Sequence, residues 1–196
     1  MTSPPDAPGR LPGAAPGRYP VDIERDWEPA GGPTVHIRAL RPDDLERELA
    51  FIRSLTPETL YLRMQYFASQ LTARDIERLL DLDYFDRLAV AGMVARPEGT
   101  SFVGVSRYAR IEGTTRAECA VVVADDWQGR GLGTELMRSL GLAVKARGIT
   151  CLEGSTLAEN QRIGAWARRF GFSVRTEPNS GGLVKVTLDL QSLSLP

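Results

Sequence analysis

A cluster of glycines at the start of a helical pattern is the part of this chain best suited to bind a phosphate group. It follows an apolar, β-branched run, Val121 to Val123, and two aspartates. Glycines let a ligand approach the backbone closely, and the first turn of a helix offers unpaired N–H groups and the positive end of its dipole. The sequence therefore predicts a phosphate-binding loop made of Gln128, Gly129, Arg130, Gly131, Leu132, Gly133 and Thr134.

The spacing of these glycines differs from two common nucleotide-binding motifs. A P-loop ends in Gly-Lys-Ser/Thr, and that ending is absent from the loop. A Rossmann fingerprint is G-x-G-x-x-G, whereas Gly129, Gly131 and Gly133 give G-x-G-x-G. The plain alternative to a phosphate-binding loop is an ordinary strand-to-helix turn with a glycine N-cap.

The residue patterns on both sides of the loop predict a domain of mixed strands and helices. Apolar residues three or four apart indicate a helix, and alternating or β-branched runs indicate strands. Leu132, Leu136, Leu140 and Val144 form such a helical stripe directly after the loop, and Gly148 suits the helix end. The expected strands are 35–40, 87–95, 101–111, 116–124, one that begins at 149, 172–176 and 183–190. The other expected helices begin near residues 42, 56 and 72, and the last one ends at Gly171.

The composition limits the kinds of protein that this chain can be. Its 196 residues suit one domain, and 42% hydrophobic and 25% charged residues are usual for a globular protein. The formal net charge of −1 argues against nucleic-acid binding driven by overall charge. No apolar run approaches the roughly 18 residues needed to cross a membrane. Because the N-terminus also lacks the apolar core of a signal peptide, we expect a cytoplasmic protein without a membrane partner.

Residues that commonly bind metals are few and scattered. The two cysteines, Cys119 and Cys151, lie in expected strands without metal-ligand spacing, so we expect reduced, buried thiols. The single histidine, His36, has no cluster of His or Cys around it. The sequence therefore predicts no metal site.

Residues 1–33 differ in composition from the rest of the chain. They contain eight of the thirteen prolines, with glycines and alanines between them. Such a segment buries too little apolar surface to offset the entropy lost on ordering. We expect a flexible tail over residues 1–33, with a short ordered piece near Tyr19 to Trp27, followed by one domain over residues 34–196.

The loop and the order of elements resemble a known family. The spacing Gln128-x-x-Gly131-x-Gly133 is similar to the Gln/Arg-x-x-Gly-x-Gly/Ala signature of the GCN5-related N-acetyltransferases (GNAT), and the resemblance covers roughly residues 34–190. Asn160 and the pair Gly171-Phe172 stand where that family often has the same residues. The resemblance implies an α+β fold in which helices flank a mixed, largely antiparallel sheet of about six to seven strands. The strand before the glycine loop is expected to splay from its neighbour.

Two further segments narrow the resemblance. Leu55 to Arg63 and Ala117 to Val121 look like the acetyltransferase domain of bacterial Pat-type protein lysine acetyltransferases. This implies transfer of acetyl to a lysine of a protein acceptor, typically an acyl-CoA synthetase. A small amine as the acceptor, on the same fold, is an alternative. A non-catalytic sensor that binds coenzyme A is a third possibility.

The family resemblance assigns acetyl-CoA as the acetyl donor. The backbone of Val121, Val122 and Val123 would pair with the pantetheine arm and offer an N–H to the thioester oxygen, and the loop from Gly129 to Thr134 would bind the pyrophosphate. Arg130 would add positive charge there or remain solvated. The Asn160 side chain would contact the cofactor or cap the helix that follows it.

A general base is needed because a lysine amine, with a pKa near 10.4, is almost wholly protonated at neutral pH. Glu118 is the candidate, since it lies just upstream in the expected cofactor strand and matches the presumed base of Pat-type enzymes. Its alternative role is an ion pair with Arg116 or Arg107. Many family members have a tyrosine as the general acid, but Ala167 occupies that position. Other tyrosines could act as the general acid in its place, but none is assigned that role: Tyr61, Tyr66, Tyr84 and Tyr108.

Overall fold

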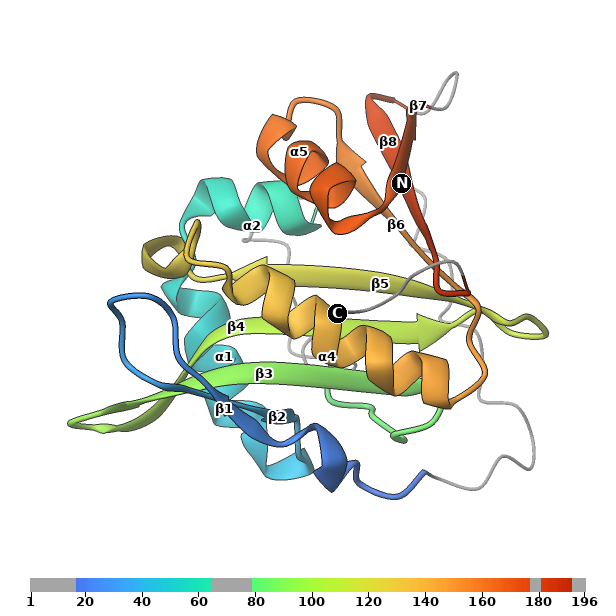
Figure 1. Cartoon of the computed structure of the whole chain (residues 1–196). Helices are drawn as coiled ribbons and strands as arrows, with labels where there is room; N and C mark the ends of the chain where they lie inside the picture. Colours follow the sequence, from blue (N-terminus) through green and yellow to red (C-terminus); the bar gives the residue numbers. More distant parts are fainter. Residues whose placement is uncertain (1–16, 65–78, 177–180, 192–196) are drawn as a thin grey trace, which may run out of the picture.

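An eight-stranded sheet organises the parts of the chain that the computed structural model describes, residues 17–64, 79–176 and 181–191 (Figure 1). The strand order is β1-β2-β3-β4-β5-β6-β8-β7, and only β5 and β6 pair in parallel. The strands are β1 Arg25–Trp27, β2 Val35–Ala39, β3 Arg87–Arg96, β4 Gly99–Arg110, β5 Arg116–Val123, β6 Cys151–Leu157, β7 Ser173–Thr176 and β8 Leu183–Asp189. The α-helices are α1 Leu45–Ser54, α2 Pro57–Met64, α4 Leu132–Ala146 and α5 Gln161–Phe170.

This architecture confirms the expected mixed, largely antiparallel sheet with flanking helices. The helix expected from residue 42 begins as a short 3₁₀ turn, Pro42–Asp44, and continues as α1. The helix expected from residue 72 falls largely outside the described residues. The sheet has one strand more than the six or seven expected, because β1 pairs antiparallel with β2. A three-residue strand is too short to show alternation, so its sequence did not distinguish it from a loop.

The segment around β1 packs against the rest of the domain. It lies in the short piece, Tyr19 to Trp27, for which local order was expected. Arg25 donates to Glu135 Oε2 at 2.7 Å and to Ser139 Oγ at 3.1 Å, both on α4. The Trp27 ring lies 3.5 Å from the place that a Cβ on Gly131 would occupy. The N-terminal strand is therefore attached to the start of α4.

Helices cover the two faces of the sheet, with α4 on one face and α1 on the other (Figure 1). Consecutive residues of a strand point to opposite faces. On β4, Ser106 Oγ donates to the Leu136 carbonyl of α4 at 3.1 Å, whereas the next residue, Arg107, pairs with Glu48 of α1. This alternation fixes which face each residue of β4 and its neighbours occupies.

The apolar stripe of α4 forms the centre of the core. Its four predicted residues, Leu132, Leu136, Leu140 and Val144, are all 0% exposed, and burial of each such side chain stabilises the fold by about 2 kcal/mol. Glycines on the facing strands let the helix approach closely. A Cβ on Gly104 of β4 would lie only 2.9 Å from Leu136 Cδ1. The position of α4, and thus of the loop before it, is set by this contact.

A buried ion pair attaches the start of α1 to β2. Arg38 donates to the two carboxylate oxygens of Asp44 at 2.7 and 2.8 Å, and the Arg41 N–H donates to Asp44 at 2.8 Å. Burial raises the pKa of Asp44, but these hydrogen bonds and the Arg38 charge lower it more, so the pKa lies below its ordinary value of 3.8. The carboxylate is thus ionised and fully paired inside the fold.

We expect Asp44→Asn to destabilise the fold by about 3 kcal/mol, because it leaves the buried Arg38 guanidinium without its counter-charge. Asp43→Asn is the matched control, since Asp43 is exposed. The lowered pKa means that the wild-type contribution is complete at neutral pH and is lost as the pH falls below 3.8 through the folded pKa. Urea unfolding at neutral and acidic pH measures this, and equal stability of the two variants at pH 7 would contradict it.

Candidate active site

The parallel strands β5 and β6 separate after three paired positions. They pair at Arg116 with Cys151, Ala117 with Leu152 and Glu118 with Glu153, and no further pair follows. Beyond that point β6 stays paired with β8 up to Leu157, while β5 stays paired with β4 up to Val123. The expected splay of the strand before the loop is confirmed, and it leaves a wedge-shaped opening between the two strands.

The register of β4 and β5 shows which backbone groups face this opening. The Ala124 N–H donates to the Val103 carbonyl at 2.9 Å. Because hydrogen-bonded residues alternate along an antiparallel pair, Val122 and Ala120 also bond to β4. The backbone groups of Val121 and Val123 therefore point away from β4 into the opening. Of the three candidate valines, Val122 directs its backbone to β4 instead.

Glycine is required where the two strands begin to part. An ideal Cβ on Gly154 of β6 would lie 2.9 Å from the Cys119 carbonyl oxygen of β5, closer than real Cβ contacts. The missing side chain lets β6 pass close to β5 at the apex of the opening. A larger residue would push the strands apart before Glu118 and Glu153 could pair.

The glycine loop places backbone donors at the mouth of the opening. A short 3₁₀ turn, Asp125–Trp127, ends β5, and two glycines follow in the left-handed region, Gly129 with φ 80° and Gly131 with φ 94°. Thr134 and Glu135 donate their N–H groups back to the Gly131 carbonyl. Among the described residues, the N–H groups of residues 129–133 have no backbone acceptor. These donors suit an anion at the start of α4.

Packing alone does not explain the last glycine of the loop. A Cβ on Gly133 would meet Val123 at 3.6 Å and Val121 at 4.0 Å, which are ordinary contacts. Gly133 also lies in the first turn of α4, where its backbone is helical. A glycine at this position leaves the backbone open to close approach, as the predicted phosphate-binding loop requires.

Two guanidinium groups lie beside the loop. The Arg130 guanidinium lies over the Trp127 ring, 5.3 Å from its centroid. Arg162, in the first turn of α5, lies 3.6 Å from an ideal Cβ on Gly129 and donates to Gln128 Oε1 at 2.6 Å. Arg162 was not a sequence candidate, because its proximity depends on how α5 folds back onto the loop. The Thr134 hydroxyl accepts a hydrogen bond from Trp166 of α5 at 3.1 Å.

Asn160 caps α5. Its Oδ1 accepts the Ile163 N–H at 3.1 Å, which is the helix-capping role. The residue also lines a hollow of 440 Å³ between α5, β6, β7 and β8. A contact between its amide and a cofactor stays a prediction.

Glu118 lies at the apex of the opening, on the face of the sheet that α1 covers. The alternative ion pairs do not form, because Arg116 pairs with Glu153 and Arg107 pairs with Glu48. Within the described ranges Glu118 is exposed and has no ion-pair partner. Its carboxylate is thus available to a group that enters from this face.

Glu153 is the neighbour of Glu118 across the strand pair, but it is already engaged. Arg116 donates to it with Nε at 3.0 Å, and Lys185 Nζ lies 3.6 Å away. Burial raises the pKa of Glu153, yet the Arg116 hydrogen bond and the charges of Arg116 and Lys185 lower it below its usual range. Of the two carboxylates, Glu118 is the one that has no ion-pair partner among the residues that the structure describes.

Two of the tyrosines named as substitutes for the missing family acid, Tyr84 and Tyr108, donate hydrogen bonds to backbone carbonyls. Ala167 is buried in α5, 2% exposed. Tyr108 donates to the Phe85 carbonyl, and burial raises its pKa. Tyr84 donates to the Leu40 carbonyl at 3.1 Å, and burial raises its pKa as well. Tyr66 lies outside the described residues.

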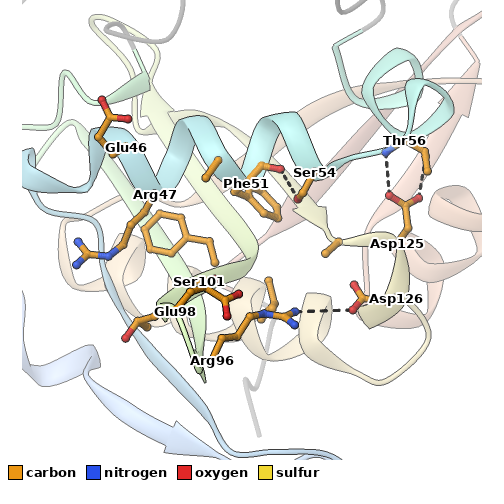
Figure 2. Close-up of a pocket in the computed structure, with 15 residues that line it drawn as sticks. Glu46, Arg47, Phe51, Ser54, Thr56, Arg96, Glu98, Ser101, Asp125 and Asp126 are labelled. Atoms are coloured by element: carbon orange, nitrogen blue, oxygen red, sulfur yellow. Dashed lines mark hydrogen bonds and ion pairs between the residues drawn. The ribbon is translucent and has the colours of Figure 1, made fainter.

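A hollow of 590 Å³ lies beside the site rather than within the opening (Figure 2). It is bounded by α1, by the β3–β4 hairpin and by the turn that follows β5, whose Asp125 and Asp126 lie at its edge. Figure 2 shows Asp125 directed toward Thr56 and Asp126 toward Arg96, which lies 4.0 Å from it.

Among the described residues, no group of three or more His, Cys, Asp or Glu side chains is arranged to hold a metal ion. None of the helices in these ranges is long and apolar enough to span a membrane.

Comparison with known proteins identifies the family. Residues 89–174 match the family model described as Acetyltransferase (GNAT) domain. A protein of Pseudomonas aeruginosa named Acetyltransferase PA5475 is 33% identical over 148 residues, which cover 76% of this chain and 80% of that protein. The open sheet, the splay and the glycine loop are therefore those of an acyltransferase, and the chain belongs to the GNAT acetyltransferase family.

Two further similarities concern proteins named Pat. Acetyltransferase Pat of Mycolicibacterium smegmatis is 32% identical over 158 residues, 74% of this chain and 46% of that protein, so the chain spans less than half of it. The crystal structure of the GNAT domain of S. lividans PAT has a TM-score of 0.80 at 27% identity, covering 88% of this chain and 99% of that one. The resemblance to Pat-type acetyltransferase domains is thus confirmed.

We expect Gly154→Ala to destabilise the fold by about 2 kcal/mol, because its Cβ would overlap the Cys119 carbonyl oxygen. Gly164→Ala is the matched control, since its Cβ would meet only the end of Arg168 at 3.7 Å and alanine favours a helix. Chemical unfolding of both variants measures the difference. Equal stabilities would show that β5 and β6 can separate at this point without cost.

Proposed function

We propose that this acetyltransferase takes acetyl from acetyl-CoA and transfers it to the side-chain amine of a lysine in a protein acceptor, such as an acyl-CoA synthetase. The thioester of acetyl-CoA supplies the activated acetyl group. The loop N–H groups of residues 129–133, with Arg130 and Arg162 beside them, are the candidates for holding its pyrophosphate. The backbone edges of Val121 and Val123 are the candidates for the pantetheine arm.

One observation carries this proposal. A single strand, β5, directs backbone groups of Val121 and Val123 into the opening, where the Val123 carbonyl accepts a hydrogen bond from Gln128. The same strand carries Glu118, whose carboxylate has no ion-pair partner among the described residues. The loop that follows the same strand supplies anion donors. In this proposal, acetyl-CoA binds along β5 and the amine loses its proton to a residue of the same strand. One rigid element would thus orient both reactants, which is how orientation lowers a reaction barrier.

Glu118 acts as the general base in this proposal. A lysine that enters from the α1 face reaches the apex of the opening as an ammonium ion and must lose a proton before it can attack. The Glu118 carboxylate, which pairs with no cation in the described part of the chain, accepts that proton directly or through a water molecule. The N–H of Val121 or Val123 is the candidate donor to the thioester oxygen. The thiolate then leaves unprotonated, since a thiol has a pKa of about 8.5.

Similarity to the Pat proteins supports a protein acceptor. The sequence resemblance rests on Leu55 to Arg63, which follows α1 and forms most of α2, and on Ala117 to Val121 of β5. These helices lie on the Glu118 side of the sheet and would form the wall that meets the acceptor.

The acceptor class can be tested by incubating the purified protein with acetyl-CoA and a cell extract, followed by mass spectrometry of acetylated lysines. We expect a small set of enzyme-dependent acetylated proteins. Turnover with free amines and no acetylated protein would instead support a small-molecule acetyltransferase. Binding of acetyl-CoA without any turnover would identify a sensor.

We expect Glu118→Gln to lower kcat by about 100-fold or more, because the amide cannot accept the proton from the amine. The Kd for acetyl-CoA should stay unchanged, since Glu118 lies outside the predicted cofactor contacts. Glu112→Gln is the control, because this exposed residue lies in the turn before β5. Steady-state kinetics and calorimetry measure both quantities. Unchanged turnover would remove Glu118 as the base.

A further inference from the structure

A chain of hydrogen bonds joins the start of α2 to the glycine loop and to α5. Arg162 Nη1 donates to Gln128 Oε1 at 2.6 Å, and Gln128 Nε2 donates to Thr59 Oγ1 at 3.3 Å. The Thr59 hydroxyl donates to Asp125 Oδ1 at 2.7 Å. We call these four residues, Arg162, Gln128, Thr59 and Asp125, the relay.

The direction of every bond in the relay is fixed by its two ends. A guanidinium can only donate and a carboxylate can only accept, so the Gln128 amide must turn its oxygen to Arg162 and its nitrogen to Thr59. The same nitrogen also donates to the Val123 carbonyl at 3.1 Å. A chain polarised between a cation and an anion is stronger than its separate bonds. Gln128 thus connects the loop, β5 and α2.

Asp125 also fixes the first turn of α2. The N–H and the hydroxyl of Thr56 donate to its carboxylate at 3.0 and 2.9 Å, as Figure 2 shows. The Thr56 hydroxyl in turn accepts the Thr59 N–H at 3.2 Å, which caps the helix. Burial raises the pKa of Asp125, but the hydrogen bonds from Thr59 and Thr56 lower it below its usual value. The carboxylate is therefore ionised at neutral pH, as the relay requires.

The two ends of the relay lie in different parts of the proposed active site. Arg162 and Gln128 adjoin the loop for the cofactor pyrophosphate, whereas Thr56 and Thr59 belong to the wall that faces the acceptor. An anion bound at the loop contacts one end. A shift of Arg162 or Gln128 on anion binding would reach α2 through the hydrogen bond between Gln128 and Thr59.

We propose that Asp125 is a positioning residue, and that the relay makes cofactor binding order the acceptor-side helix α2. The inference rests on the proposed function, because it requires the loop to bind coenzyme A and α2 to border the acceptor. It assigns the Gln128 side chain the task of joining the loop to α2, in addition to the loop backbone that holds the ligand.

Amide hydrogen exchange with coenzyme A as the probe tests the relay without an identified acceptor. In the wild-type protein we expect coenzyme A to slow exchange both in the loop, residues 129–134, and in α2, residues 57–64. In Asp125→Ala the loop should keep its protection, α2 should lose it, and the Kd for coenzyme A should rise about fivefold or more. Asp126→Ala is the matched control, because the Asp126 side chain is 65% exposed and only approaches Arg96 at 4.0 Å.

A second pair of variants keeps the test decisive if Asp125→Ala does not fold. Thr59→Val removes the hydroxyl at nearly constant volume and should lose the α2 protection, whereas Thr59→Ser keeps the hydroxyl and should retain it. Protection of α2 that survives in Thr59→Val or Asp125→Ala would overturn the relay, as would wild-type protein protected in the loop alone. A wild-type loop unprotected by coenzyme A would overturn the proposed cofactor site instead.

Discussion

The parting of β5 from β6 after Glu118 is the constraint on which the rest of this structure depends. Two adjacent strands normally stay paired, because unpaired backbone groups are costly when buried. Here each strand keeps its other neighbour, β4 for β5 and β8 for β6, and gives up only the pairing between them. The opening persists because each of the two strands is fixed by the elements on its other side. On the β5 side this packing comes from α4, which approaches β4 closely at Gly104.

The charges on the face of the sheet that α1 covers follow from the same arrangement. Three glutamates, Glu48, Glu118 and Glu153, lie on or against this face, and arginines of β4 and β5 hold two of them. Arg107 pairs with Glu48 and Arg116 pairs with Glu153, so that within the described ranges Glu118 is the glutamate of the three without an ion-pair partner. That residue lies at the last position where β5 and β6 pair, so its backbone is rigid although its side chain is exposed.

The sequence predicted the features that depend on local pattern. Glycine spacing predicted the loop, and helical periodicity predicted the buried stripe of α4, because both patterns lie within short stretches of sequence. The splay was expected from the family resemblance. Contacts between distant segments could not be predicted in this way. Thr59 and Asp125 are 66 residues apart, and Arg162 reaches Gln128 only after α5 folds back onto the loop. Even the choice between Val122 and its neighbours required the register of β4, which no pattern within β5 reveals.

The contacts of the short strand β1 determine how far the N-terminus of this enzyme can be shortened. Composition places the boundary of the domain near residue 34, yet Arg25 is bonded to two side chains of α4 and Trp27 lies behind Gly131. A shortened chain that began at residue 34 would keep every candidate catalytic and cofactor residue. It would also leave β2 as an open sheet edge and remove the aromatic ring that backs the loop. Truncation at this end would therefore alter ligand affinity and association between molecules, although no residue of the active site is deleted.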